Sequence, residues 1–336
     1  MLSVPDFNFR VTIISILILS MTFGCFAQDQ KGKNPSNPRL GPPPGYYKTT
    51  GHKDDIKIPF VIDRMEIMIK AEMNGKKINY LIDNGVMWDQ LLFFGSTLVD
   101  SLGMNYEGEA LVKGAGEGDG AQSYSASGVT ISFEGITFYD QEAIITSKES
   151  GFAEWWPGVA GQVCGAFFKH FVVEFNFDKN IMTLHKPETF KYKGHGRALK
   201  MTRDSTGSYS VPVILNQDGN REISTALFID IGGEVPIHMA INEESGIRKP
   251  EGAVKKRLGY GASGEVNGYE GSFNSVKLAG YELKNLEAKF TEGNSDNTTC
   301  TIGLPLLMRF NVVFDYFSEL MYIEPNEHLN LPVPLK

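Results

Sequence analysis

Beyond about residue 57, the hydrophobic residues fall in short runs that are rich in β-branched and aromatic side chains. Gly, Asn and Asp separate one run from the next. Runs of this kind are typical of β-strands joined by tight turns. No long amphipathic helix pattern interrupts them. The pattern therefore predicts an all-β protein.

The strand pattern occurs twice along the chain. Asn74-Gly75 precedes an apolar strand that ends in the triplet Asp83-Asn84-Gly85, and Asp218-Gly219 precedes one that ends in Asp230-Ile231-Gly232. Both dipeptides suit the left-handed positions of a tight hairpin. Each half of the chain is thus expected to contain a hairpin whose second strand ends in an Asp-x-Gly turn.

Further segments repeat in the same order. Gly114-Ala115-Gly116 matches Gly259-Tyr260-Gly261, 145 residues later (114 to 259), and 167–177 matches 306–316, 139 residues later (171 to 310). A fixed order with slowly drifting spacing indicates a duplicated unit whose loops have changed length. We expect two lobes, at 58–192 and 198–327. A short helix-like segment should feed a strand near the end of each lobe.

The repeats place a carboxylate at an equivalent position of each unit. A single Asp-x-Gly triplet is usually an ordinary turn. Two of them in a duplicated chain can meet at the pseudo-twofold axis, however, and two adjacent carboxylates share one proton. One carboxylate can then activate a water molecule while the other donates a proton to a substrate carbonyl. The glycine of each triplet would let the backbone approach closely beneath the pair.

These segments resemble the retropepsin and pepsin class of aspartic peptidases, and most closely bacterial exported predicted aspartyl proteases with two retropepsin-like lobes. The resemblance covers nearly all of 58–325. Its motifs are Tyr80 to Gly85, Phe228 to Gly232, Ile302 to Phe310 with the strand that follows, and the weaker copy Val163 to Phe168.

The resemblance implies two six- to seven-stranded β-barrel lobes with a peptide or protein substrate bound in the cleft between them. It implies that Asp83 and Asp230 are the catalytic pair. Asn84, Gly85, Ile231 and Gly232 would support the active-site loops. The substrate-binding flaps would contain Gly114, Gly116, Gly259, Tyr260 and Gly261.

The triplets depart from the family pattern, which is Asp-Thr-Gly or Asp-Ser-Gly with hydroxyls that brace the two loops. Asn84 can still hydrogen-bond through its amide, whereas Ile231 has no polar side-chain atom. Two functions therefore stay open: an aspartic-type endopeptidase, and a catalytically inactive peptide-binding protein of the cell envelope on the same scaffold. Carboxylates lying far apart would instead favour an unrelated all-β adhesion or carbohydrate-binding module.

The amino terminus has the pattern of an export signal. Arg10 precedes an apolar run at 11–23, and small residues follow. This predicts a signal peptide over 1–27 and a location in the periplasm or cell envelope. Cys25 offers an alternative, because a lipid can be attached to a cysteine at this position. We expect the protein to contact a membrane only through such a lipid anchor. The Pro- and Gly-rich segment 28–57 is expected to be a linker.

The composition of the chain limits the kinds of ligand and partner that we expect. The chain has 336 residues and a formal net charge of −8, which gives no electrostatic reason to expect nucleic acid. It contains no CxxC or HExxH motif, so we expect neither a metal nor another cofactor. The sequence leaves open whether Cys164 and Cys300 pair. A duplicated chain should complete its own site, so a monomer suffices.

Overall fold

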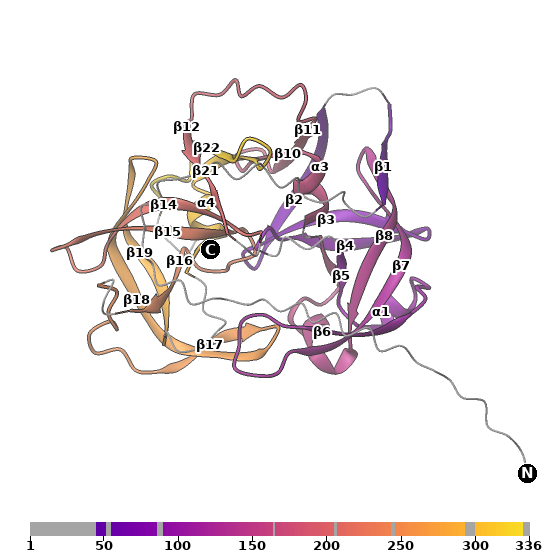
Figure 1. The fold of residues 1–336 in the computed structure, drawn as a ribbon, viewed down its shortest axis with the longest axis horizontal. Coiled ribbons are helices and arrows are strands. Elements are labelled where there is room, and N and C mark those ends of the chain that lie inside the picture. Colours follow the sequence, from indigo (N-terminus) through magenta and orange to yellow (C-terminus); the bar gives the residue numbers. More distant parts are fainter. Residues whose placement is uncertain are drawn as a thin grey trace, which may run out of the picture.

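The computed structural model describes residues 45–51, 55–85, 90–163, 165–204, 207–242, 246–292 and 300–331. Within them the chain is built of β-strands with a few single-turn helices, which confirms the all-β prediction. Figure 1 shows two lobes side by side. Lobe 1 contains β1 to β11 and lobe 2 contains β12 to β22.

The elements of lobe 1 follow one another along the chain as β1 (Tyr46–Thr49), β2 (Asp55–Asp63), β3 (Glu66–Met73), β4 (Lys76–Ile82), β5 (Leu91–Phe93), α1 (Thr97–Asp100), β6 (Gly108–Val112), β7 (Ala121–Phe133), β8 (Ile136–Thr146), η1 (Lys148–Ser150), α2 (Phe152–Trp155), β9 (Val159–Val163), α3 (Gly165–His170), β10 (Val172–Asn176) and β11 (Ile181–His185).

Those of lobe 2 are β12 (Arg197–Lys200), β13 (Thr202–Arg203), β14 (Tyr209–Asn216), β15 (Glu222–Asp230), β16 (Ile237–Ile241), β17 (Lys256–Gly261), β18 (Gly264–Leu278), β19 (Tyr281–Glu292), β20 (Thr301–Gly303), α4 (Leu304–Leu307), β21 (Phe310–Asp315) and β22 (Leu320–Pro325).

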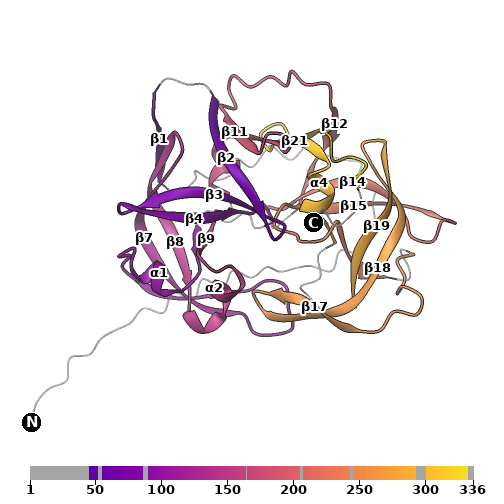
Figure 2. The same ribbon diagram turned by 180° about the vertical axis from the view of Figure 1, so that it is seen from behind.

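The pairing of the strands confirms the duplication. In lobe 1, β4 pairs parallel with β9, β9 antiparallel with β5, and β5 parallel with β8. In lobe 2, β15, β20, β16 and β19 repeat these pairings with the same directions. Figure 2 shows the hairpin β3–β4 running toward the junction from one side and β14–β15 from the other. Each copy thus delivers one Asp-x-Gly turn to the junction.

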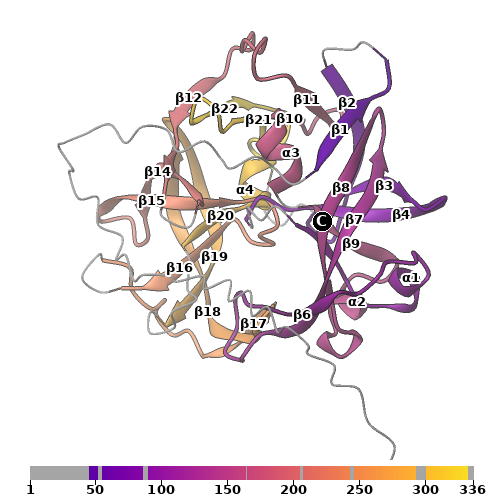
Figure 3. The same ribbon diagram turned by 45° about the vertical axis from the view of Figure 1, so that its right-hand side comes forward.

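A shared sheet joins the lobes. Its strand order is β12-β22-β21-β10-β11-β2, and the antiparallel pair β10–β21 connects one lobe to the other. Phe175 and Phe314 pack edge to face across this pair, with ring centroids 6.1 Å apart. Each of these rings is fully buried, which contributes roughly 2 to 3 kcal/mol. The predicted helix-like segments α3 and α4 lead into these two strands, and Figure 3 shows both helices near the centre of the molecule.

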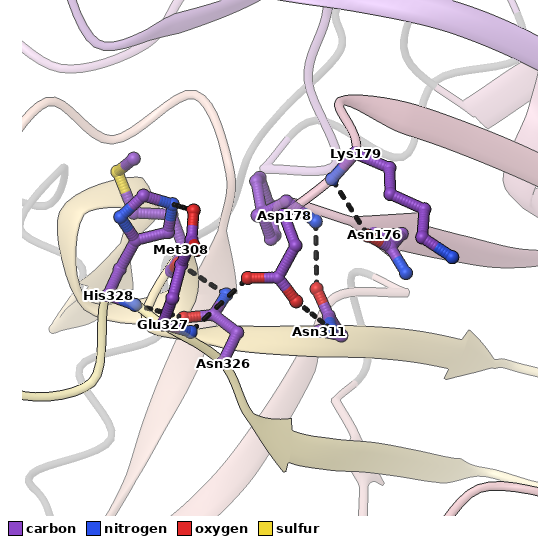
Figure 4. A network of polar contacts seen from close by, with 9 residues as sticks. Asn176, Asp178, Lys179, Met308, Asn311, Asn326, Glu327 and His328 are labelled. Carbon is purple, nitrogen blue, oxygen red and sulfur yellow. Dashed lines mark hydrogen bonds and ion pairs between the residues drawn. The ribbon is translucent and has the colours of Figure 1, made fainter.

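Polar contacts add to the junction at the turn between β10 and β11 (Figure 4). Asn311 on β21 donates to Asp178 in that turn over 2.8 Å, and the backbone N–H of Glu327 donates to the other oxygen of Asp178 over 3.2 Å. One carboxylate of lobe 1 thereby holds both a strand of lobe 2 and the segment that follows β22.

Two details differ from expectation. The hairpin at Asn74-Gly75 has both residues at positive φ, as predicted, but β14 and β15 are joined by a five-residue loop, 217–221, in which Gly219 has a positive φ and Asp218 does not. The segment expected to be a linker includes β1 and the start of β2. Both are ordered by main-chain pairing, β1 with β8 and β2 with β11. The predicted signal peptide, Cys25 and most of the linker lie outside the described residues.

The shared sheet also contains a titratable cluster that predicts how stability depends on pH. His185 binds Asp55 through Nδ1 and Glu174 through Nε2, each over 2.8 Å. Burial lowers the pKa of His185, but its hydrogen bonds to Glu174 and Asp55 outweigh burial, so the pKa is raised. The charged imidazolium is therefore stabilised by the fold.

We expect the free energy of unfolding to include a contribution from His185 that is complete below the unfolded-state pKa of about 6.5. It should be lost as the pH rises through the higher folded-state pKa. Urea unfolding at a series of pH values measures this contribution, which His185→Gln should remove. His195→Gln, at an exposed histidine, is the matched control. An unchanged pH dependence in His185→Gln would contradict the assignment.

Candidate active site

The two Asp-x-Gly turns meet at the junction of the lobes. Asp83 directly follows β4, and its backbone N–H donates to the carbonyl of Val163 over 3.1 Å. Asp230 ends β15 and lies opposite Gly303 of β20. Each aspartate is thus fixed by a parallel partner strand in the interior of its own lobe.

The glycines of the triplets show how closely the carboxylates approach. A Cβ atom on Gly85 would lie 2.5 Å from Asp230 Oδ1, and one on Gly232 would lie 2.8 Å from Asp83 Cγ. The Gly85 position is also 3.0 Å from Asp83 Oδ1, so the two Oδ1 atoms are at most about 5.5 Å apart, the sum of 2.5 and 3.0 Å. Carboxylates this close argue against an unrelated all-β adhesion or carbohydrate-binding module.

Hydrogen bonds orient both carboxylates. The N–H of Gly85 donates to Asp83 Oδ1 over 2.6 Å, and the N–H of Gly232 donates to Asp230 Oδ1 over 3.0 Å. Asp83 also accepts a bond from the amide of Gln162 over 3.1 Å. The sequence pattern does not single out Gln162. Its only signal is a polar residue in the apolar strand β9, just before a segment that repeats.

Asn84 braces one turn against the other lobe. Its Oδ1 accepts the backbone N–H of Ile231 over 2.7 Å, and its Nδ2 donates to the hydroxyl of Tyr316 over 2.9 Å. Asn84 is buried, and so are both partners. The amide of Asn84 therefore takes up the bracing that hydroxyls provide in the family pattern, while Ile231 contributes its backbone N–H and an apolar side chain.

The environment makes the two aspartates share a proton. Burial raises the pKa of Asp83, and its bonds from Gly85 and Gln162 partly offset this effect. Burial also raises the pKa of Asp230, and the nearby charge of Asp83 raises it further. Asp230 is therefore the aspartate that retains a proton when Asp83 is ionised, within a pair that titrates as a unit.

The glycine-rich segments lie in two hairpins, β6–β7 of lobe 1 and β17–β18 of lobe 2, whose tips touch (Figure 1). Ser263 donates its N–H to Ala115 O over 2.9 Å and accepts the N–H of Gly118 over 2.5 Å. The glycines permit this approach: a Cβ on Gly116 would lie 2.6 Å from Gly264 N, and one on Gly261 2.2 Å from Ala115 O.

The remaining predicted flap residues lie at the same contact. The N–H of Gly114 donates to Ser263 Oγ over 3.2 Å. Tyr260 on β17 stacks on Trp155 of lobe 1 with ring centroids 5.6 Å apart, next to Gly259 on the same strand. The structure thus brings all five predicted flap residues to hairpins that bridge the lobes.

Among the described residues, one group has the spacing of a metal site: Asp178, Glu327 and His328, with ligand-type atoms within 4.8 Å of one another. Both oxygens of Asp178 already accept hydrogen bonds that tie the lobes together, and both carboxylates are exposed (Figure 4). We assign this group a structural role.

Two further expectations concern the cysteines and the membrane. Cys300 accepts the N–H of Ala240 at its sulfur over 3.4 Å. Cys164 lies outside the described residues, so the structure does not decide between paired and unpaired cysteines. In the part of the chain that the structure describes, none of the helices has the length and apolar character needed to span a membrane.

Comparison with known proteins identifies the fold. No protein-family model and no curated protein matches the sequence. Among solved structures, the chain is similar to an aspartic proteinase from Irpex lacteus, with a TM-score of 0.51 and 14% sequence identity. The match covers 82% of this chain and 99% of that one. The chain therefore has the two-lobed aspartic proteinase fold.

The brace formed by Asn84 predicts a loss of stability when it is removed. Asn84→Ala would leave the Ile231 N–H and the Tyr316 hydroxyl buried without their partner. We expect the free energy of unfolding to fall by about 2 to 3 kcal/mol in urea titrations. Asn220→Ala, at an exposed asparagine, should change it by less than about 0.5 kcal/mol. Equal effects of the two substitutions would contradict the brace.

Proposed function

We propose that this chain is an exported aspartic-type endopeptidase that hydrolyses peptide bonds with a water molecule activated between Asp83 and Asp230. The observation that carries the proposal is the reciprocal approach of each carboxylate to the glycine of the opposite triplet. Export is supported by the signal-like pattern of 1–27. The substrate is a peptide or protein, and a single chain supplies both aspartates.

The electrostatics assign the two roles. Asp83, with the lower pKa, is ionised and takes a proton from the water as it attacks the carbonyl carbon of the scissile bond. Asp230 is protonated and donates to the carbonyl oxygen, so that a tetrahedral diol forms. Collapse of the diol breaks the C–N bond, and the proton held by Asp83 passes to the leaving nitrogen while Asp230 recovers its own. The products are a carboxylic acid and an amine.

The contacts around the pair support this chemistry. Gln162 and the N–H of Gly85 stabilise ionised Asp83. The bridging hairpins β6–β7 and β17–β18 would have to separate to admit a peptide and would cover it afterwards, which excludes bulk water from the reaction. The substrate-binding role of the flap residues belongs to this proposal.

A second candidate is a peptide-binding protein of the cell envelope without turnover. It is favoured by Ile231, whose side chain has no polar atom with which to brace the turns as Asn84 does. This candidate requires that peptide binds to the wild-type chain without being cleaved.

The proposed roles predict the effect of neutralising each aspartate. Asp83→Asn removes the base and Asp230→Asn removes the acid, so each should lower kcat/KM on a peptide substrate by at least about 10³-fold. Asp140→Asn, at an exposed aspartate, should leave the rate within about twofold. Peptide binding by the wild type without cleavage would support the second candidate, and cleavage that persists in both variants would sink the assignment.

The plot of kcat/KM against pH should be bell-shaped. Activity is lost below the pKa of Asp83, where the base is protonated, and above that of Asp230, where the acid is ionised. Both limbs should lie above the ordinary aspartate value of about 3.9, because burial raises both pKa values.

Gln162→Leu should move the acidic limb of this bell upward, because it removes a bond that lowers the pKa of Asp83. Gln122→Leu, at an exposed glutamine, is the control. An acidic limb that stays in place in Gln162→Leu would show that Asp83 is not the base.

A further inference from the structure

The face of lobe 1 that carries Asp83 carries another carboxyl, that of Glu66. Strands β3 and β4 pair antiparallel with Met68 opposite Leu81. Continuing this register by two residues brings Glu66 next to the Asp83 turn, and the charge of Asp83 acts on the Glu66 carboxyl. Opposed residues of an antiparallel pair project to the same face, with Cβ atoms about 5 Å apart. The side chain of Glu66 thus lies on the same face of lobe 1 as the carboxyl of Asp83.

Glu66 is buried without a partner. The residue is 5% exposed, and among the described residues its carboxyl makes no hydrogen bond or ion pair. Burial, together with the negative charges of Asp83, Glu234 and Asp230, raises its pKa to about 10, and the positive charge of Arg64 offsets only part of this rise. The carboxyl is therefore protonated until a further cation pairs with it. A largely buried carboxyl without a hydrogen bond is costly, and a cationic ligand group would supply a partner and lower its pKa.

An apolar wall extends from Glu66 on the same face. Leu81, Val112 and Ala121 belong to a hydrophobic cluster separate from the main core, and Met68 and Trp155 pack against it. Ala262, from the flap tip of lobe 2, packs against this cluster too. The wall therefore lies beneath the flaps, where the tip of lobe 2 reaches lobe 1, and Met68 connects it to the face of β3 that carries Glu66.

An apolar wall beside the Glu66 carboxyl favours a substrate side chain with a long apolar stem and a cationic end. Lysine and arginine bury their methylene stems against apolar surface while the charged end reaches a polar partner. A purely apolar side chain would fill the wall but leave Glu66 without a partner, and an acidic one would be repelled by Glu234 and by the charge of the catalytic pair.

We infer that Glu66 forms the acidic end of a substrate subsite that selects peptides with lysine or arginine close to the scissile bond. The inference rests on the proposed function, whose site it shares. Glu66 determines specificity and takes no part in bond cleavage. Glu234, exposed on lobe 2, strengthens the negative potential from the opposite side.

The test uses peptides in which a hydroxyethylene group replaces the scissile amide, so that binding is measured without turnover. Lysine and norleucine, which have stems of similar length, are compared at each of the three positions on either side of that group. Isothermal titration calorimetry gives Kd for the wild type, Glu66→Gln and Glu72→Gln. Glu72 is the matched control, because it is exposed on the same face of β3.

We expect lysine to bind the wild type at least about tenfold more tightly than norleucine at one position, the scale of one added charged hydrogen bond. Glu66→Gln should reduce this ratio to about one, while its Kd for the norleucine peptide stays within about threefold, which also shows that the variant is folded. Glu72→Gln should keep the wild-type ratio.

Separate turnover measurements on the matching amide peptides distinguish the two proposals. Lysine-selective binding without cleavage supports the subsite and overturns the enzymatic function. Cleavage without a lysine preference, or a preference that survives in Glu66→Gln, overturns the subsite and leaves the enzymatic function standing. Failure of every peptide to bind the wild type overturns the subsite as well.

Discussion

The approach of two buried carboxylates to within about 5.5 Å of each other is the constraint on which the structure depends. Buried like charges repel, so the pair persists only if it keeps a proton and if its oxygens have donors. Asp83 and Asp230 each accept the N–H of the glycine two residues on. The same two glycines leave no Cβ in the way of the opposite carboxylate. Glycine at the third position of each triplet thus donates a hydrogen bond to one carboxylate and leaves room for the other.

The rest of the fold fixes the positions of the two Asp-x-Gly turns relative to each other. Each aspartate ends a strand that is fixed by a parallel neighbour inside its lobe, and the strand pair β10–β21 fixes one lobe relative to the other. Asn84 adds a hydrogen bond across the junction. The equivalent residue of lobe 2, Ile231, has no polar side-chain atom and cannot make the matching bond. The symmetry of the backbone is therefore greater than the symmetry of the side chains. The two aspartates take different protonation states because the charge of Asp83 raises the pKa of Asp230, while the bond from Gln162 lowers that of Asp83.

The sequence was sufficient to predict what depends on local pattern and repetition: the β-strands, the duplication, the turn at Asn74-Gly75 and the meeting of the two aspartates. It was insufficient for contacts between residues distant in the chain. Gln162, Tyr316 and Glu66 reach the site through strand register and packing, which no single segment encodes. The loop after β14 was expected to be tight because Asp218-Gly219 suits a two-residue turn, yet the pairing of Asn216 with Glu222 sets a longer one.

The central claim is that the aspartates share one proton across the lobe junction. Carbon-13 NMR of labelled aspartate carboxyls during a pH titration tests it most directly. The account predicts one resonance that titrates well above the ordinary value of about 3.9 in the wild type and that shifts toward lower pH in Asp83→Asn, because the neighbouring charge is gone. Two carboxyls that titrate independently near the ordinary value, unaffected by the substitution, would contradict it.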